Sequence, residues 1–350
     1  MFLNRKIAAP LALWAVLALA GQALQAQSYE LSGDRVAIYN LAGEVTLEAG
    51  SGSQVVVEVT LRGDDAGQLR IETGAVRGRE TLRVIYPGDR VVYGDHGDSR
   101  TQLRVRDDGT FSDGGHDYGD RVRISSSGDG LEAYADIKIR VPSGQTLDVY
   151  LAVGEISASN VSGDLRLDTH SAPVTTTGTR GSLLVDVGSG RVSVTDAEGD
   201  VDIDTGSGSV EATGIRGDML RIDTGSGRVT TSDISVTQLS IDTGSGGVEV
   251  ANAIARDVMV DTGSGSVRVE LMADARDIEI DTGSGSVTLS VPESFGAEVE
   301  IETGSGSIDL DFPLQVHRFE RTSITGTLGD GDGRVTIDTG SGNIRILKSG

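Results

Sequence analysis

The sequence predicts an all-β protein built as a stacked β-solenoid of two-strand coils. The segment Ile203-Asp-Thr-Gly-Ser-Gly-Ser-Val210 recurs through the second half of the chain at intervals of 18 to 21 residues. Apolar and polar residues alternate on both sides of each copy, which is typical of strands with one buried face. Aromatic residues make up only 4% of the chain, as expected for a narrow core of Val, Ile and Leu.

The repeats occupy residues 146–350. Further copies begin at Ile222, Ile241, Val260, Ile280, Ile301 and Ile337, and weaker copies begin at Leu167 and Val185. The last interval, from Glu302 to Asp338, has double length. It holds either one degenerate coil or an excursion through Phe319 to Asp332.

Each copy contains two short strands separated by a Gly-Ser-Gly turn. We expect its glycines, such as Gly244 and Gly246, to supply the positive φ angles of a tight turn. One coil cannot bury its apolar face alone, so the coils should stack at the strand spacing of about 4.8 Å. An array of antiparallel hairpins is the alternative, because two strands and a tight turn also describe a hairpin.

Residues 27–145 form a predicted N-terminal β region. Its segment Ile38–Val45 resembles the segment around Tyr150 and predicts a first coil near the start of the chain. Strand-like runs follow at residues 55–61, 81–86, 102–105 and 135–141. Residues 87–130 are rich in Asp, Gly, Arg and Ser, and predict an acidic arm, either a long hairpin or an excursion from the stack.

Residues 1–26 read as a signal peptide: Arg5 and Lys6 precede an apolar run and then small residues. The sequence therefore predicts export to the periplasm or the cell surface, with no membrane span after cleavage. The chain has no cysteine, and its 53 acidic against 30 basic residues give a formal charge of −23. This balance argues against nucleic-acid binding and favours a soluble surface or basic and cationic partners.

The opening "IYNLAGEVTL", the later "IRVPSGQTLDVYLAVGEISASNVSGDLRLDT" and the serial "DTGSGSV" units resemble the adhesin-labelled family of β-strand-repeat proteins of bacterial envelopes. The resemblance covers nearly the whole chain after the signal peptide. It implies a surface or envelope role, and it carries over no catalytic residues because its motif consists of glycines and apolar positions.

Asp-Thr-Gly after an apolar residue also matches the aspartic-protease signature, but that chemistry needs one close pair of carboxylates rather than a stacked column. The column could instead bind Ca²⁺, and its candidate ligands are Asp204, Asp223, Asp242, Asp261, Asp281 and Glu302. The simpler interpretation is that each acid caps its own turn by accepting backbone N–H groups. A metal site at His96 and His116 in the arm is a further option, although their spacing matches no ligand motif.

These observations predict a non-enzymatic envelope protein, with no catalytic, cofactor-binding or firm metal-binding residue. We expect an adhesion or binding module whose ligand is a glycan or a protein. The alternatives are a self-associating structural scaffold, whose open terminal coil pairs with another chain, and a carbohydrate-active β-helix enzyme. Such an enzyme would need a few acids that break the repeat at one cleft.

Overall fold

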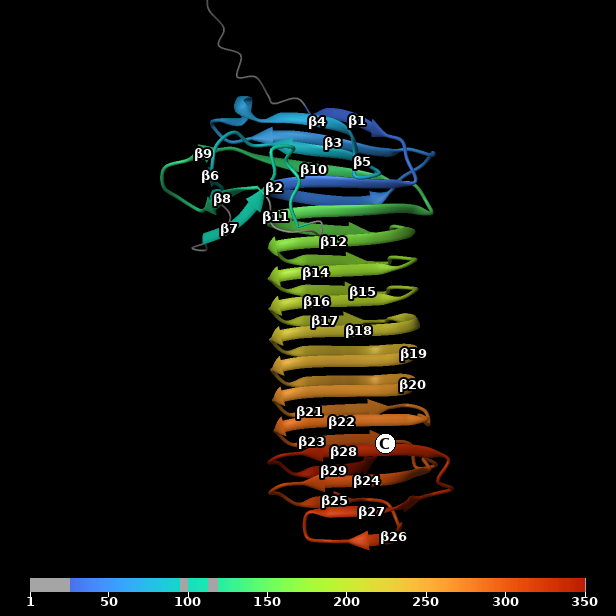
Figure 1. Ribbon diagram of the computed structural model, residues 1–350. Helices are drawn as coiled ribbons and strands as arrows, with labels where there is room; N and C mark the ends of the chain where they lie inside the picture. The colour runs from blue at the N-terminus through green and yellow to red at the C-terminus, as the bar shows by residue number, and fades with distance from the viewer. Residues whose placement is uncertain (1–25, 95–99, 113–118, 350) are drawn as a thin grey trace, which may run out of the picture.

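A computed structural model describes residues 26–94, 100–112 and 119–349, and it confirms the predicted β-solenoid (Figure 1). The signal-peptide prediction concerns residues almost all of which lie outside this range. Each coil contributes one strand to each of two sheets, and successive coils pair in parallel with equivalent residues opposite one another, as Asp204 is opposite Asp223.

One sheet, which we call the acid sheet, carries the Asp of each repeat. In pairing order it contains β5 (Arg79–Ile85), β2 (Arg35–Ala49), β11 (Gln145–Ser159), β12 (Gly163–Ser171), β14 (Leu183–Ser189), β16 (Val201–Ser207), β18 (Arg216–Ser226), β19 (Val229–Ser245), β20 (Val248–Ser264), β22 (Asp277–Ser284), β28 (Gly333–Thr339) and β24 (Ala297–Thr303).

The opposite sheet contains the second strand of each coil. In pairing order it has β10 (Tyr134–Val141), β2, β11, β13 (Val174–Thr177), β15 (Val192–Thr195), β17 (Val210–Thr213), β19, β20, β21 (Val267–Leu271), β23 (Val287–Val291), β29 (Ile344–Lys348) and β25 (Ile308–Leu310). The long strands β2, β11, β19 and β20 take part in both sheets.

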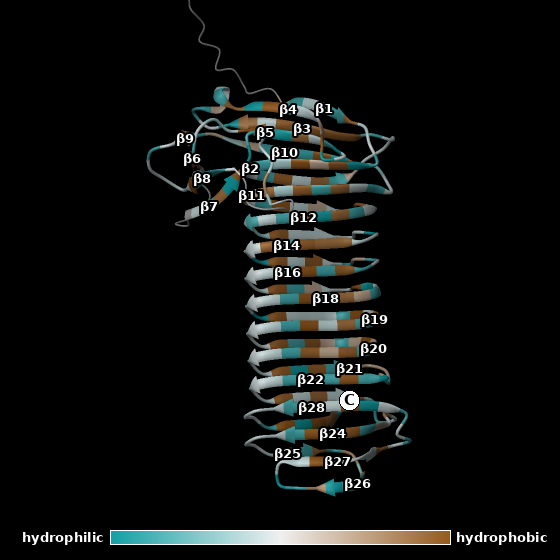
Figure 2. Cartoon of the chain, viewed as in Figure 1, coloured by the Kyte–Doolittle hydropathy of each residue, from teal (hydrophilic) through white to brown (hydrophobic). Residues whose placement is uncertain are grey.

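Both sheets turn their alternate apolar residues inward, and Figure 2 shows this alternation along the strands. Ile203, Ile222 and Ile241 stack on one another in successive coils, and each is at most 1% exposed. Ser240, one residue before Ile241, points outward and is only half-buried. The predicted alternation and its register are therefore confirmed. The first coil is also where the sequence placed it, since Tyr39 of β2 pairs with Tyr150 of β11.

Antiparallel pairs among the described residues occur only in the arm and at the two ends, so the hairpin-array alternative is wrong for the repeats. At the N-terminal end, β4 (Arg70–Val76) pairs with β5, while β3 (Val55–Arg62) pairs with β10 and with β1 (Gln27–Leu31). At the other end, β27 (Ser323–Leu328) pairs with β24 and with β26 (Leu314–Phe319). These antiparallel strands extend β5 and β10 at one end and β24 at the other, while the only described pairing of β25 is with β29.

The last coil in the sequence is not the last coil in space. Strands β28 and β29 lie between the coil of β22 and β23 and the coil of β24 and β25. The chain end marked in Figure 1 accordingly lies within the stack. Residues between Glu302 and Asp338 include the hairpin of β26 and β27, so the double-length interval is an excursion, and the expected contact of Asp281 with Glu302 is interrupted by Asp338.

The arm forms a separate sheet of four strands. Its strands, in pairing order, are β7 (Arg100–Val105), β8 (Asp120–Ser125), β6 (Arg90–Val92) and β9 (Leu131–Glu132). A short 3₁₀ helix, Ala66–Gln68, lies between β3 and β4 in the chain. The arm lies beside the stack at its N-terminal end (Figure 1).

The turn glycines are required by the contact between coils more than by their dihedral angles. A Cβ atom at Gly244 would lie 2.7 Å from the carbonyl oxygen of Gly225, and one at Gly246 would lie 1.9 Å from that of Gly227. Gly246 has a φ of +153°, whereas Gly244 is not among the glycines with positive φ, which corrects the expectation for that residue. The glycine backbones of adjacent coils are packed directly against each other.

The threonine of each Asp-Thr-Gly turn points into the core. Thr282 donates its hydroxyl to the carbonyl oxygen of Gly265 at 3.1 Å, but the buried hydroxyls of Thr224 and Thr243 have no hydrogen-bond partner among the described residues. Val187 occupies the same position in an early coil. The site therefore selects the shape of a β-branched side chain, and its hydroxyl is dispensable in several coils.

Gly246→Ala should destabilise the fold by about 1–3 kcal/mol, because the added methyl would overlap the Gly227 carbonyl oxygen. Gly247→Ala is the matched control, since the nearest atom to its Cβ, the Ser266 carbonyl oxygen, is 3.6 Å away. This control should be neutral or slightly stabilising. Equal unfolding free energies of the two variants in urea would contradict the close contact between coils.

Candidate functional site

The outer surface of the acid sheet carries rows of equivalent side chains, because in-register stacking places the same position of each coil in line. The row nearest the Gly-Ser-Gly turn is acidic. In stacking order its members are Asp168, Asp186, Asp204, Asp223, Asp242, Asp261, Asp281, Asp338 and Glu302. The sequence-predicted acids are thus brought together, and the structure adds Asp338 between the last two.

The predicted capping of the turns is not seen. In the part of the chain that the structure describes, none of the acids from Asp186 onward in this row accepts a hydrogen bond from a backbone N–H. Their carboxylates point to solvent while the following threonines point inward. The Asp-Thr-Gly acids therefore form a line along one edge, which differs from the close pair of carboxylates used by aspartic proteases.

Arginines neutralise the first part of the acid sheet. Arg166 bridges Asp168 at 3.1 Å and Asp186 at 3.4 Å, and Arg221 lies 3.5 Å from Asp223. From Asp242 onward, the acids of the row have no ion-pair partner among residues 26–94, 100–112 and 119–349. Burial, and then repulsion from Asp223 and Asp261, raises the pKa of Asp242 above its usual value. Burial and repulsion from Asp186 and Asp223 act in the same direction on the pKa of Asp204.

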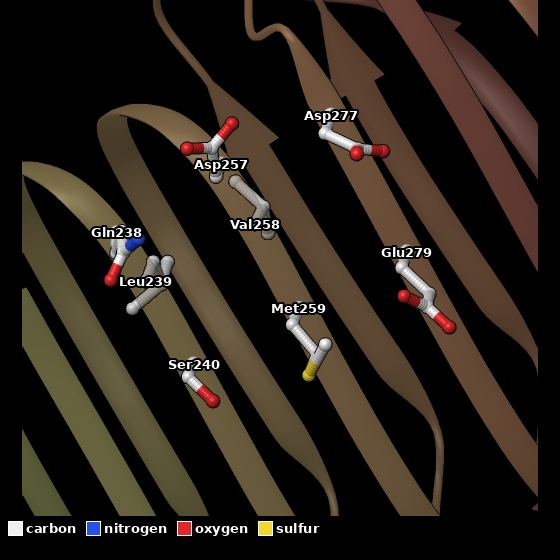
Figure 3. A pocket seen from close by; sticks show the side chains of 8 residues that line it. All are labelled: Gln238, Leu239, Ser240, Asp257, Val258, Met259, Asp277 and Glu279. Atoms are coloured by element: carbon white, nitrogen blue, oxygen red, sulfur yellow. The ribbon is translucent and has the colours of Figure 1, made fainter.

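A groove of about 290 Å³ crosses three coils of the acid sheet (Figure 3). It is lined by Gln238, Leu239, Ser240, Asp257, Val258, Met259, Asp277 and Glu279. Strands β19, β20 and β22 place these residues in two rows, Gln238–Asp257–Asp277 and Ser240–Met259–Glu279. Leu239 and Val258 are buried and form the floor.

The rim of the groove combines one exposed apolar side chain with three carboxylates. Met259 is 50% exposed, although most apolar residues of these strands face the core. Figure 3 shows Asp257 and Asp277 on neighbouring strands, with Glu279 beside Met259. None of the three acids forms an ion pair or hydrogen bond within the described residues. Such a surface suits a Lys or Arg side chain, whose apolar stem can cover Met259 while its charged end meets a carboxylate.

Sequence reasoning missed this groove. The predicted acids lie one row away, and Asp257, Asp277 and Glu279 are not part of the Asp-Thr-Gly motif. Counting back two and four residues from each Asp of the Asp-Thr-Gly motif gives the positions of both rows. The irregular residue types at these positions are the signal, since Ser240, Met259 and Glu279 occupy equivalent places in three coils.

The structure shows no metal centre in its described ranges: no three His, Cys, Asp or Glu side chains there are arranged to hold an ion. Calcium binding by the acid row stays a prediction. The suggested site at His96 and His116 lies outside the described residues. No helix in the described part of the chain has the length and apolar character needed to cross a bilayer.

Comparison with known proteins gives a family match and distant solved structures, including the following two. The family model described as Toastrack DUF4097 matches residues 90–347. A candidate cell adhesion protein of Clostridium sporogenes is 9% identical and has a TM-score of 0.24, with 93% of this chain and 99% of that chain covered. A candidate adhesin of Bacteroides fragilis is 10% identical and has a TM-score of 0.33, with 92% and 96% covered. No curated protein matches.

Asp242→Asn should raise the melting temperature at neutral pH. Because the pKa of Asp242 is raised in the folded chain, the folded state holds its proton more tightly than the unfolded state. This contribution to stability is present below the unfolded pKa and is lost as the pH rises through the folded pKa. The charged Asp242 is therefore unfavourable at neutral pH, and the gain of the variant should disappear at about pH 3.

The control is Glu211→Gln, which removes one exposed acid of β17 on the opposite sheet. It should change the melting temperature less than Asp242→Asn does at neutral pH. A fall in melting temperature for Asp242→Asn at both pH values would instead show that this carboxylate stabilises its turn.

Proposed function

The chain belongs to the Toastrack DUF4097 family, and from that premise we propose that it is a non-enzymatic binding module of the bacterial envelope. Its function is adhesion through the acid sheet to a protein partner that presents Lys or Arg side chains. The single observation that carries this proposal is the groove around Met259, where an exposed apolar side chain lies among three carboxylates without ion-pair partners.

The shape of the acid sheet supports binding to a surface. Parallel rows of side chains extend along the stack, so a partner with basic residues at regular intervals can meet several coils at once. Each contact between exposed charges is weak, about 1 kcal/mol or less. Repetition along the sheet adds such contacts together, and Met259 provides the apolar contact that fixes the position of the partner.

The predicted export is consistent with the same function. A charged, basic start followed by an apolar run is typical of a signal peptide, and the high negative charge suits a protein that must not adhere to anionic lipid. We therefore place the protein at the cell surface or in the periplasm, where an adhesion module can reach its partner.

Glycan cleavage is a second candidate, because Asp257, Asp277 and Glu279 are acids outside the main repeat that gather in one groove. Glycoside hydrolases use two carboxyl groups on either side of the scissile bond. Here the three carboxylates project from neighbouring strands of a single sheet (Figure 3), so they line one floor rather than two facing walls. This arrangement favours binding over cleavage.

Binding of a fluorescent lysine-rich peptide should test the proposal. The triple variant Asp257→Asn/Asp277→Asn/Glu279→Gln should weaken binding at least tenfold, as the loss of one to two charge-assisted contacts of about 1.5 kcal/mol predicts. Met259→Ser should weaken it by a smaller factor. The affinity should fall with rising salt in the wild type.

The charge-matched control is Glu211→Gln/Glu249→Gln/Glu270→Gln, which removes three acids from strands of the opposite sheet. Equal weakening in both triple variants would show that only net charge matters, and would overturn the groove as the binding site. Release of new reducing ends from a glycan substrate, lost in the first triple variant, would favour the enzymatic candidate instead.

A further inference from the structure

The arm carries a basic face in an otherwise acidic protein. The register of its sheet places Arg104 opposite Arg121 and Gln102 opposite Arg123, and Arg90 lies beside Arg123 on the other neighbouring strand. Since facing residues of a ladder point to the same side, these four arginines share one face. All four are exposed. The chain as a whole has a formal charge of −23, so this cluster runs against its composition.

This placement is unfavourable for the protein by itself. Like charges directly opposite each other on neighbouring strands are destabilising, and Arg104 and Arg121 form such a pair. Arg104 donates a hydrogen bond to the Gly119 carbonyl oxygen at 2.9 Å, but neither arginine has a carboxylate partner among the described residues. Positions where a sequence breaks such a rule without compensation are often functional. A bound anion would supply the missing compensation.

A cavity lies where this face meets the stack. Its volume is about 440 Å³, and it is lined by Gln102, Leu103, Arg104, Ser112, Arg121 and His170. The arm contributes two guanidinium groups, one amide and one hydroxyl, and the stack contributes the imidazole. The cavity is therefore supplied with several hydrogen-bond donors and no carboxylate among these lining residues.

His170 is itself a departure from the repeat. It occupies the position of the first turn glycine, next to Thr169, which pairs with Val187 in the following coil. The later coils have Gly188, Gly206 and Gly225 at this position. The coil that faces the arm thus has an imidazole where those coils have no side chain. Partial burial lowers the pKa of His170, although its side chain remains solvent-exposed, and the neutral ring can donate one hydrogen bond.

An aromatic contact holds the arm against the stack. Phe111 of the arm packs edge-on against Tyr39 and Tyr150, with ring centroids 5.9 and 6.5 Å away. These two tyrosines stack on each other at 4.5 Å. Arg79 of β5 donates hydrogen bonds of 2.9 Å to the hydroxyl groups of both tyrosines and forms an ion pair of 2.8 Å with Asp148. The aromatic contact holds the strands that carry Gln102, Arg104 and Arg121 beside the coil of His170.

We propose that the cavity between the arm and the stack binds a phosphate or carboxylate group through Arg104, Arg121 and His170. Bidentate guanidinium contacts suit both groups, and the histidine adds a third donor from the stack. This site is separate from the acid sheet and takes ligands of the opposite charge, so it does not depend on the adhesion proposed above.

Isothermal titration of the full chain with inorganic phosphate, at constant ionic strength maintained with chloride, tests the proposal. We expect one binding site. Arg104→Gln and Arg121→Gln should each weaken it at least about tenfold, and His170→Ala should weaken it by a smaller factor. Arg228→Gln, which removes an exposed arginine of the distant turn between β18 and β19, should leave the affinity within about twofold.

Three further titrants distinguish the sources of the anion: a hexuronate oligomer, a polyphosphate and vesicles of phosphatidylglycerol. Binding of any of them that Arg121→Gln abolishes supports the proposal and identifies the natural carrier. In chloride buffer without phosphate, Arg121→Gln should melt at the same or a higher temperature than the wild type, because it removes a like-charge pair. Absence of binding to all probes, or equal binding by Arg121→Gln and Arg228→Gln, would overturn the proposed anion site.

Discussion

The backbones of neighbouring coils are in direct contact at the turns, and this contact sets the spacing and register of the whole stack. Parallel strands pair at about 4.8 Å, and this spacing leaves no room for a Cβ atom at the second glycine of the Gly-Ser-Gly turns. Gly227 and Gly246 approach so closely that a Cβ atom on Gly246 would lie 1.9 Å from the carbonyl oxygen of Gly227. A coil shifted by one residue would place a serine side chain in that space and would turn Ile241 to solvent. The glycines and the apolar alternation therefore specify the same register.

A fixed register has an electrostatic consequence, because any residue repeated in each coil becomes a row. The acid row concentrates carboxylates along one edge, and two unit charges about 5 Å apart repel by roughly 1 kcal/mol even in water. The chain tolerates this cost and offsets part of it with Arg166 and Arg221. Surface sites that differ from coil to coil occur where the repeat is broken. Met259 forms the apolar part of the groove, and His170 supplies a side chain at a turn that is otherwise glycine.

Much of the fold could be predicted from the sequence, because the repeat, its alternation and its glycines are all local. The acid row followed from the same reasoning. The insertion of β28 and β29 could not be predicted, since the interval of 21 residues between Asp281 and Glu302 is equally compatible with stacking in sequence order. The contact of Phe111 with Tyr39 and Tyr150 joins segments far apart in the chain, and no repeated motif predicts it. The arginine face likewise depends on strand pairing within the arm, whereas the two rows of the groove follow from the repeat register.

The order of the coils in space differs from their order in the sequence, because the C-terminal coil of β28 and β29 lies between the coils of β22 and β24. The cysteine-free chain permits a direct test by oxidative cross-linking. Glu279→Cys/Thr336→Cys joins residues paired across β22 and β28, and neighbouring strands lie within the Cα distance of about 4.4–6.8 Å that disulfides require. We predict that this pair forms an intramolecular disulfide and that Glu279→Cys/Glu300→Cys does not, since Thr336 separates these positions. The reverse result would show stacking in sequence order and would contradict the account.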